Sequence, residues 1–152
     1  MFDLYDELTA IVDLLETREI AYALCGGIAM AVHGYTRATE DIDLFMPPDE
    51  AGRAEIAVSD LGYNVRARPM IVSNGMMQIR RVSKIDPADG DLITLDLLLV
   101  TPASEGVWAT RQRLIWRDRT ISVVSREGLV TLKKFRSSKI DLADIEFLEG
   151  SE

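Results

Sequence analysis

Two aspartates, Asp41 and Asp43, lie in a segment that runs to Met46 and has the pattern of a β-strand. On a strand, residues i and i+2 point to the same face, so the two carboxylates are neighbours. Neighbouring carboxylates repel each other and are costly to remove from water unless a cation lies between them. The pair on this strand therefore predicts a divalent cation at its surface.

A glycine pair, Gly26-Gly27, follows a short apolar run and precedes a short helical pattern. Glycine allows close backbone approach, and the N–H groups of a first helical turn bind phosphate. The alternative is an ordinary tight turn between a strand and a helix. The chain lacks the Gly-x-Gly-x-x-Gly pattern at this position and has no Gly-Lys-Ser/Thr sequence. Together with the aspartate pair, the glycines predict a metal and nucleotide site.

A third carboxylate, Asp96, lies in the middle of the most apolar segment, residues 92–100. A carboxylate in such a strand needs a partner. It is predicted to be a third metal ligand beside Asp41 and Asp43, because three carboxylates can hold two Mg²⁺ ions in nucleotidyl transfer. The alternatives are a salt bridge to an arginine or lysine, and exposure to solvent from a one-sided strand.

The whole chain shows no repeat or linker, which predicts one domain over residues 1–152. Helices are expected at residues 3–18, 28–33, 49–61, 126–137 and 141–149. Strands are expected at residues 20–25, 41–46, 63–68, 76–82, 92–100, 113–116 and 120–124. We expect Asp3 and Ser125 to cap helices, and Asn74-Gly75 to form a turn before the strand at 76–82. That strand is predicted to be an edge that pairs with a second copy in a homodimer.

Composition narrows the class of protein. An apolar content of 47% predicts a globular chain, and the net charge of −8 argues against non-specific binding of nucleic acid. No apolar run has the length of a membrane span, and no secretion signal is recognisable at the N-terminus. The single cysteine, Cys25, is expected to be a buried thiol, which fits a cytoplasmic location.

Residues 26–44 read GGIAMAVHGYTRATEDIDL and resemble the signature of the DNA polymerase β-like nucleotidyltransferase superfamily. They most resemble the branch that contains the AbiEii/AbiGii-type toxins, whose pattern is Gly-Gly/Ser, a helix, Gly, and then Arg-x-Thr-x-Asp-x-Asp. Arg37, Thr39, Asp41 and Asp43 match this pattern. Residues 134–145 resemble the late Lys…Arg…Lys/Asp-x-x-Asp motif of the same branch.

The resemblance implies an α/β (α+β) nucleotidyltransferase fold, with a small mixed sheet and helices packed on it. It implies Mg²⁺-dependent transfer of a nucleoside monophosphate from an NTP to a hydroxyl group of an acceptor. Asp41 and Asp43 would bind the metal, and Asp96 would be both a metal ligand and the base for the hydroxyl. The residues implied to bind the nucleotide are Gly26, Gly27, Arg37, Thr39, Lys134, Arg136 and Lys139, with Asp141 and Asp144 orienting the basic side chains.

Three functions remain open at this point. The first is nucleotidyl transfer to RNA such as tRNA, to a protein or to a small molecule, as part of a toxin–antitoxin pair with an antitoxin as partner. The second is a catalytically degenerate protein on the same fold that binds a nucleotide or a partner, since Gly27 replaces a common serine. The third is nucleotidylation of an antibiotic, where the acidic balance suits a cationic acceptor such as an aminoglycoside.

Overall fold

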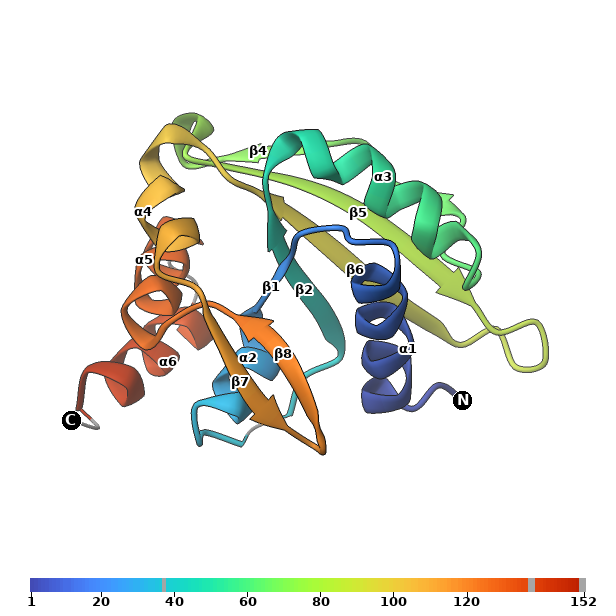
Figure 1. The fold of residues 1–152 in the computed structure, drawn as a ribbon, viewed down its shortest axis with the longest axis horizontal. Coiled ribbons are helices and arrows are strands. Elements are labelled where there is room, and N and C mark those ends of the chain that lie inside the picture. Colours follow the sequence, from blue (N-terminus) through green and yellow to red (C-terminus); the bar gives the residue numbers. More distant parts are fainter. Residues whose placement is uncertain (37, 137–138, 151–152) are drawn as a thin grey trace.

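The computed structural model describes residues 1–36, 38–136 and 139–150, with only the backbone at 136, 139 and 140 (Figure 1). The helices are α1 (Leu4–Thr17), α2 (Gly26–Val32), α3 (Pro48–Ser59), α4 (Glu105–Ala109), α5 (Arg126–Arg136) and α6 (Lys139–Gly150), with short 3-10 turns η1 (Ser73–Gly75) and η2 (Pro102–Ser104). The strands are β1 (Ala23–Cys25), β2 (Asp41–Met46), β3 (Val65–Arg66), β4 (Met70–Val72), β5 (Met77–Ile85), β6 (Leu92–Leu99), β7 (Gln112–Trp116) and β8 (Arg119–Val123).

All the described strands belong to one mixed sheet in the order β3-β5-β6-β2-β1-β8-β7, and β4 also pairs with β5. The pairs β2–β6 and β1–β8 are parallel, whereas the remaining pairs are antiparallel. This mixed sheet with helices packed on it confirms the predicted fold class. The two aspartate-bearing strands, β2 and β6, are adjacent at its centre.

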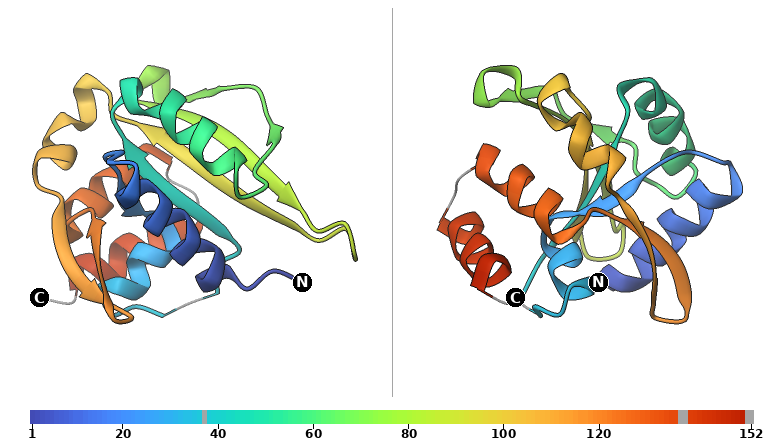
Figure 2. Two further views of the ribbon diagram at one scale, coloured as in Figure 1. Left: turned by 45° about the vertical axis from the view of Figure 1, so that its right-hand side comes forward. Right: turned by 60° about the vertical axis from the view of Figure 1, so that its left-hand side comes forward.

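Helices cover both faces of the sheet (Figure 2). α1 and α3 lie on one face, where Glu7 of α1 pairs with Lys84 and Glu55 of α3 pairs with Arg80. The side chains of Arg80 and Lys84 alternate with that of Arg81 along β5, so Arg81 points to the opposite face. α2 and α5 lie on that opposite face, and α6 packs against α5. None of the described helices has the length and apolarity needed to cross a membrane.

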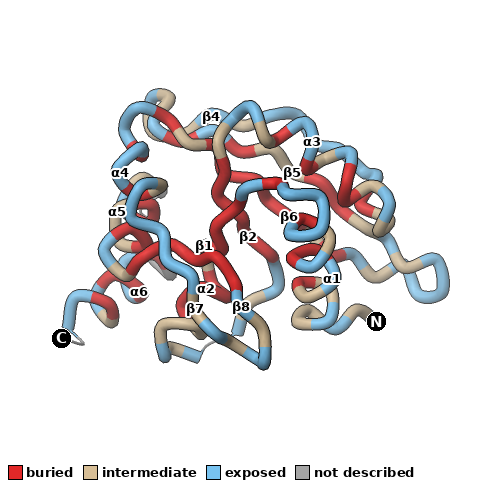
Figure 3. The backbone as a smooth tube through the Cα atoms, in the orientation of Figure 1, coloured by how far each residue is buried: buried red, intermediate tan, exposed pale blue. Residues whose placement is uncertain are grey.

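The core runs through the centre of the sheet, where β1 and most of β2 and β6 are buried (Figure 3). In β2, consecutive residues 42–46 are all buried, because both faces of this strand are covered. On α1, the side chains of Leu8, Ile11, Val12 and Leu15 form one buried stripe at helical spacing. A central strand buried on both faces has little room for a charge, so the buried carboxylates of Asp43 and Asp96 indicate a functional or paired role.

Several local predictions are confirmed. The carboxylate of Asp3 accepts from the N–H groups of Tyr5 and Asp6, and the N–H of Gly128 donates to Ser125 Oγ at 3.0 Å, so both caps are present. The strands expected at residues 113–116 and 120–124 are present as β7 and β8, and they form a hairpin whose turn has positive φ angles at Arg117 and Asp118.

Other local predictions are wrong. β5 is not an edge strand, because β6 pairs with one side of it and β3 and β4 pair with the other. The homodimer predicted from that edge therefore loses its basis. The Asn74-Gly75 turn does precede β5, but it joins β5 to β4, a strand too short to show an alternating pattern. α2 begins at Gly26 itself rather than two residues later.

Candidate active site

A row of side chains crosses four adjacent strands on the face that α2 and α5 flank. Arg81 of β5 pairs in register with Asp96 of β6, and Asp96 pairs with Asp43 of β2. Asp43 in turn pairs with Cys25 of β1. Because residues in register on adjacent strands point to the same side, the four side chains share one face. Asp41 lies on the same face two residues before Asp43, so the structure brings the three predicted aspartates together.

The three aspartates differ in burial. Asp43 and Asp96 are 7% and 5% exposed, whereas Asp41 lies at the exposed start of β2. A carboxylate with so little access to water needs compensating partners, because desolvation disfavours its charge. The buried members of the row are therefore held by the protein, and Asp41 is the member that faces solvent.

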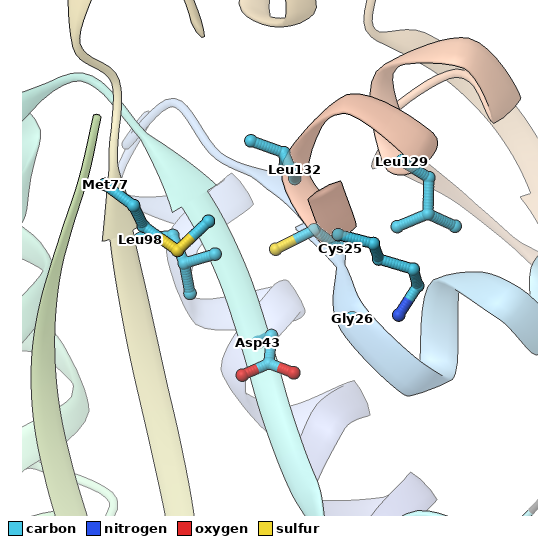
Figure 4. Close-up of a pocket in the computed structure, with 8 residues that line it drawn as sticks. Cys25, Gly26, Asp43, Met77, Leu98, Leu129 and Leu132 are labelled. Atoms are coloured by element: carbon cyan, nitrogen blue, oxygen red, sulfur yellow. The ribbon is translucent and has the colours of Figure 1, made fainter. Parts of the chain in front are cut away.

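Gly26 at the start of α2 lies against Asp43 of β2, and both residues line the pocket in Figure 4. The φ of Gly26 is +69°, and a Cβ atom placed there would lie 2.0 Å from Asp43 Oδ2 and 2.7 Å from Asp43 Cβ. A side chain at this position would thus collide with the carboxylate, and an L-residue would also be strained by the backbone. Glycine is required at this position because the start of α2 approaches the aspartate on β2 too closely for a side chain.

Asp96 makes a bidentate ion pair with Arg81. The Nε and Nη2 atoms of Arg81 donate to the two carboxylate oxygens at 2.7 Å and 3.0 Å. This hydrogen bonding, together with the charges of Asp96, Asp41 and Asp43, raises the pKa of Arg81 above its usual value. The ion pair is one of the two alternatives that the sequence left open for this aspartate.

Lys133 of α5 lines a small pocket with Gly26 and Asp43. Its side chain is 3% exposed, and its Nζ lies 2.8 Å from Asp144 Oδ2 and 3.7 Å from Asp141 Oδ1. The cavity is about 20 Å³, which is room for a single water. The ammonium group of this pocket-lining residue is thus fixed by two buried carboxylates of α6.

The remaining predicted residues fall in different places. Gly27 is buried in the first turn of α2, and the Thr39 hydroxyl lies 3.5 Å from the carbonyl oxygen of Asp41. Lys134 does not line the pocket: its side chain is 59% exposed and lies 3.8 Å from Glu149. Arg37 lies outside the described residues, as do the side chains of Arg136 and Lys139.

Sequence reasoning missed Arg81 and Lys133 as members of the site. A signal existed for the lysine, since it is one residue from Leu132 and four from Leu129, on the buried side of α5. A charge on the apolar stripe of a helix needs a partner, just as Asp96 does on its strand. For Arg81 no such signal exists, because its role depends on the register between β5 and β6.

The carboxylates of the site can be compared with the ligands that Mg²⁺ uses in proteins. Among the residues that the structure describes, no group of three or more His, Cys, Asp or Glu is arranged to hold a metal ion. Mg²⁺ is commonly bound through one or two carboxylates together with substrate phosphates. Asp41 and Asp43 provide such a pair on one face of β2, next to the first turn of α2. The donor set therefore fits Mg²⁺ that arrives with a nucleotide.

Comparison with known proteins gives one matching family and several solved structures that share the fold. Residues 7–128 match the family described as aminoglycoside-2''-adenylyltransferase. No curated protein sequence matches the chain.

Solved structures with the same fold include an antibiotic adenylyltransferase and an antibiotic-resistance factor. LnuA, a lincosamide antibiotic adenylyltransferase solved with lincomycin, aligns with a TM-score of 0.59 and 18% identity over 97% of this chain and 97% of its own. ANT(2'')-Ia in complex with adenylyl-2''-tobramycin aligns with a TM-score of 0.60 and 16% identity over 95% of this chain and 86% of its own. A proposed nucleotidyltransferase from Thermotoga maritima aligns with a TM-score of 0.62 and 16% identity over 96% of this chain and 88% of its own.

Proposed function

The chain belongs to the aminoglycoside-2''-adenylyltransferase family and is thus a nucleotidyltransferase, and we propose that it transfers AMP from ATP to a hydroxyl group of a small-molecule antibiotic. The observation that carries the proposal is the contact between Gly26 and Asp43. It supports the proposal because the carboxylate proposed to bind the metal lies directly beside the backbone of a first helical turn, a kind of position that can bind phosphate. Triphosphate and metal would meet at this point.

The proposed reaction forms one phosphorus–oxygen bond and breaks another. The hydroxyl oxygen of the acceptor attacks the α-phosphorus, the bond from the α-phosphorus to the bridging oxygen breaks, and pyrophosphate leaves. The proton of the hydroxyl passes to a carboxylate, for which we propose Asp96 because it lies in register with Asp43. Its ion pair with Arg81 fixes the orientation that proton transfer requires.

The metal would be held by Asp41 and Asp43. Bound there, Mg²⁺ would neutralise phosphate charge and assist departure of pyrophosphate. The roles of the protein are to keep the two carboxylates on one face of β2 and to hold the phosphates at Gly26 and Gly27. Thr39 supports the start of this strand through its hydroxyl, which lies 3.5 Å from the carbonyl oxygen of Asp41.

We assign to Lys133 the role that the sequence gave to its neighbour Lys134. Lys133 lines the pocket with Gly26 and Asp43, and its ammonium group is held by Asp141 and Asp144. A fixed, buried cation in this position favours the negative charge that develops on the phosphates during transfer. Lys134 is a surface residue, and single surface ion pairs contribute little.

A small cationic acceptor fits the charge distribution. A hollow of about 320 Å³ beside the start of β2 is lined by Thr39, Glu40 and Asp91, among others. Carboxylates at its wall would attract amino groups. Among the acceptors that the sequence left open, the family and the two antibiotic-related neighbours favour a small molecule. The toxin hypothesis rests on the resemblance of residues 26–44 and 134–145 to that branch.

The test is an acceptor screen with purified protein and Mg²⁺. Each of the four NTPs is combined with aminoglycosides, with lincosamides and with total tRNA, and products are identified by mass spectrometry and pyrophosphate release. We expect ATP-dependent addition of AMP to an antibiotic and no labelling of tRNA. Labelled tRNA with unmodified antibiotics would overturn the proposal and support the toxin hypothesis. No transfer to any acceptor, with NTP binding intact, would favour a degenerate protein.

A further inference from the structure

The row of carboxylates contains its own cation. Arg81 engages both oxygens of Asp96, at 2.7 Å and 3.0 Å, and no other ion pair of Arg81 is found among the described residues. The guanidinium side chain is 41% exposed, whereas the Asp96 side chain is 7% exposed, so the arginine lies on the solvent side of the pair. Any ion that approaches Asp96 from this side meets a positive charge first.

The charges of the row decide how many metal ions it attracts. Asp41, Asp43 and Asp96 carry three negative charges and Arg81 carries one positive charge, which leaves two negative charges. One divalent cation neutralises this row. A second divalent cation would need Asp96 as a ligand, and it would lie next to the guanidinium, where like charges repel.

The neighbouring arginine provides a contrast. Arg80 points to the opposite face of β5 and pairs with Glu55 at 2.9 Å, so it ties α3 to the sheet. Arg81 connects no helix to the sheet, because its partner is on the adjacent strand, where backbone pairing already joins β5 and β6. A purely structural role explains the Arg80 pair better than the Arg81 pair.

We propose that Arg81 takes the place of a second metal ion at Asp96, so that the site binds one divalent cation, at Asp41 and Asp43. Arg81 is a positioning residue that keeps Asp96 out of metal coordination. The inference rests on the proposed function, because it concerns the same carboxylates. It replaces the two-metal site expected from the sequence with one metal and one guanidinium.

The test is metal binding in the absence of acceptor. Mn²⁺ binding is titrated by electron paramagnetic resonance, with a non-hydrolysable ATP analogue present, on the wild type and on Arg81→Met. The wild type should bind one Mn²⁺ ion beyond what the analogue alone binds. Arg81→Met should bind a second ion, or bind the first about tenfold more tightly, because a neighbouring positive charge is gone.

Two control variants separate charge from folding. Arg80→Met removes an arginine from the other face and should leave Mn²⁺ binding as in the wild type. Arg81→Lys keeps the positive charge and should keep the one-ion stoichiometry. If Arg81→Met is poorly folded, Mn²⁺ should raise its Tm more than that of Arg80→Met, since the metal would then neutralise Asp96.

Each outcome has one meaning. Two Mn²⁺ ions in the wild type, unchanged binding in Arg81→Met, or no Mn²⁺ binding in either protein would overturn the inference. The acceptor screen is a separate readout. Transfer of AMP with unchanged Mn²⁺ binding in Arg81→Met would refute the role of Arg81 alone, whereas the predicted Mn²⁺ shift without any transfer would refute the proposed function alone.

Discussion

Replacing Gly26 by alanine tests the close approach on which the proposed site depends. The new Cβ would lie 2.0 Å from Asp43 Oδ2 and 2.7 Å from both Cβ and Cγ of Asp43. Rotation of the carboxylate relieves only the first contact, because the Cβ atom of Asp43 is fixed by the β2 backbone. Either the start of α2 or the centre of β2 must therefore move.

The expected loss of stability has two parts. An L-residue at a φ of +69° costs about 1–2 kcal/mol relative to glycine. Forcing an extra methyl group into a packed site costs about 1–3 kcal/mol more. We therefore expect Gly26→Ala to lower the free energy of unfolding by about 2–5 kcal/mol, against about 5–15 kcal/mol for a typical domain.

Two other glycines supply matched controls for urea unfolding followed by the fluorescence of Trp108 and Trp116. Gly90 has a φ of +74°, and a Cβ atom added there would meet nothing within 4 Å, so Gly90→Ala should show the backbone cost alone, about 1–2 kcal/mol. Gly52 lies inside α3 with open space around it, so Gly52→Ala should stabilise the protein by about 0.5–1 kcal/mol.

The comparison of Gly26→Ala with Gly90→Ala isolates the collision. A further loss in Gly26→Ala, together with a fall in nucleotidyl transfer of about 100-fold, would fit a displaced Asp43, because an error of about 1 Å in an active site costs that much. Equal losses of stability in both variants, with transfer unaffected in Gly26→Ala, would refute the reasoning and leave an ordinary tight turn as the explanation of the glycine pair.

Three further changes test other parts of the site and the fold. Asp43→Asn should lower nucleotidyl transfer by about 100-fold or more while the Tm changes little, and full activity in that variant would remove the metal role. Lys133→Met should lower the free energy of unfolding by about 3–5 kcal/mol, because it removes a buried ammonium group that lies between two buried carboxylates, whereas Lys134→Met should change it by less than about 0.5 kcal/mol. Burial, together with the hydrogen bond to Glu7, raises the pKa of Tyr63. The stability that this neutral phenol contributes is present below the ordinary pKa of 10.0 and is lost as the pH rises above it, so Tyr63→Phe should flatten the fall of Tm at alkaline pH.

Strongly patterned elements were predictable from the sequence. The helix α1 and the largely buried strands β2 and β6 were readable because their patterns extend over several residues. β3 and β4 have two and three residues, and α4 has five, so no period can establish itself in them. These three short elements form because of their contacts with β5 and with the core. A local sequence pattern carries no information about such contacts.

Of the site, the sequence indicated which residues carry chemistry but not what each one faces. The expected partner of Asp43 was a metal ion, and the structure adds the backbone of Gly26 at contact distance. The lysine beside the pocket is Lys133 rather than Lys134, a difference of one residue and therefore of about 100° around α5. A motif locates such a residue in the chain, but the rotation of its helix selects the side chain that enters.

The row of Arg81, Asp96, Asp43 and Cys25 shows where local reasoning ends. Strand order β5-β6-β2-β1 brings together residues that are dispersed through the chain, and a shift of one residue in the register of β5 against β6 would turn Arg81 to the face of α1 and α3. Asp96 would then be a buried carboxylate without its guanidinium, a costly state. The Arg81 pair thus favours the native register of β5 and sets the charge of the site through the same two hydrogen bonds. Arg81→Met should accordingly change both stability and metal stoichiometry, whereas Arg80→Met should change stability alone.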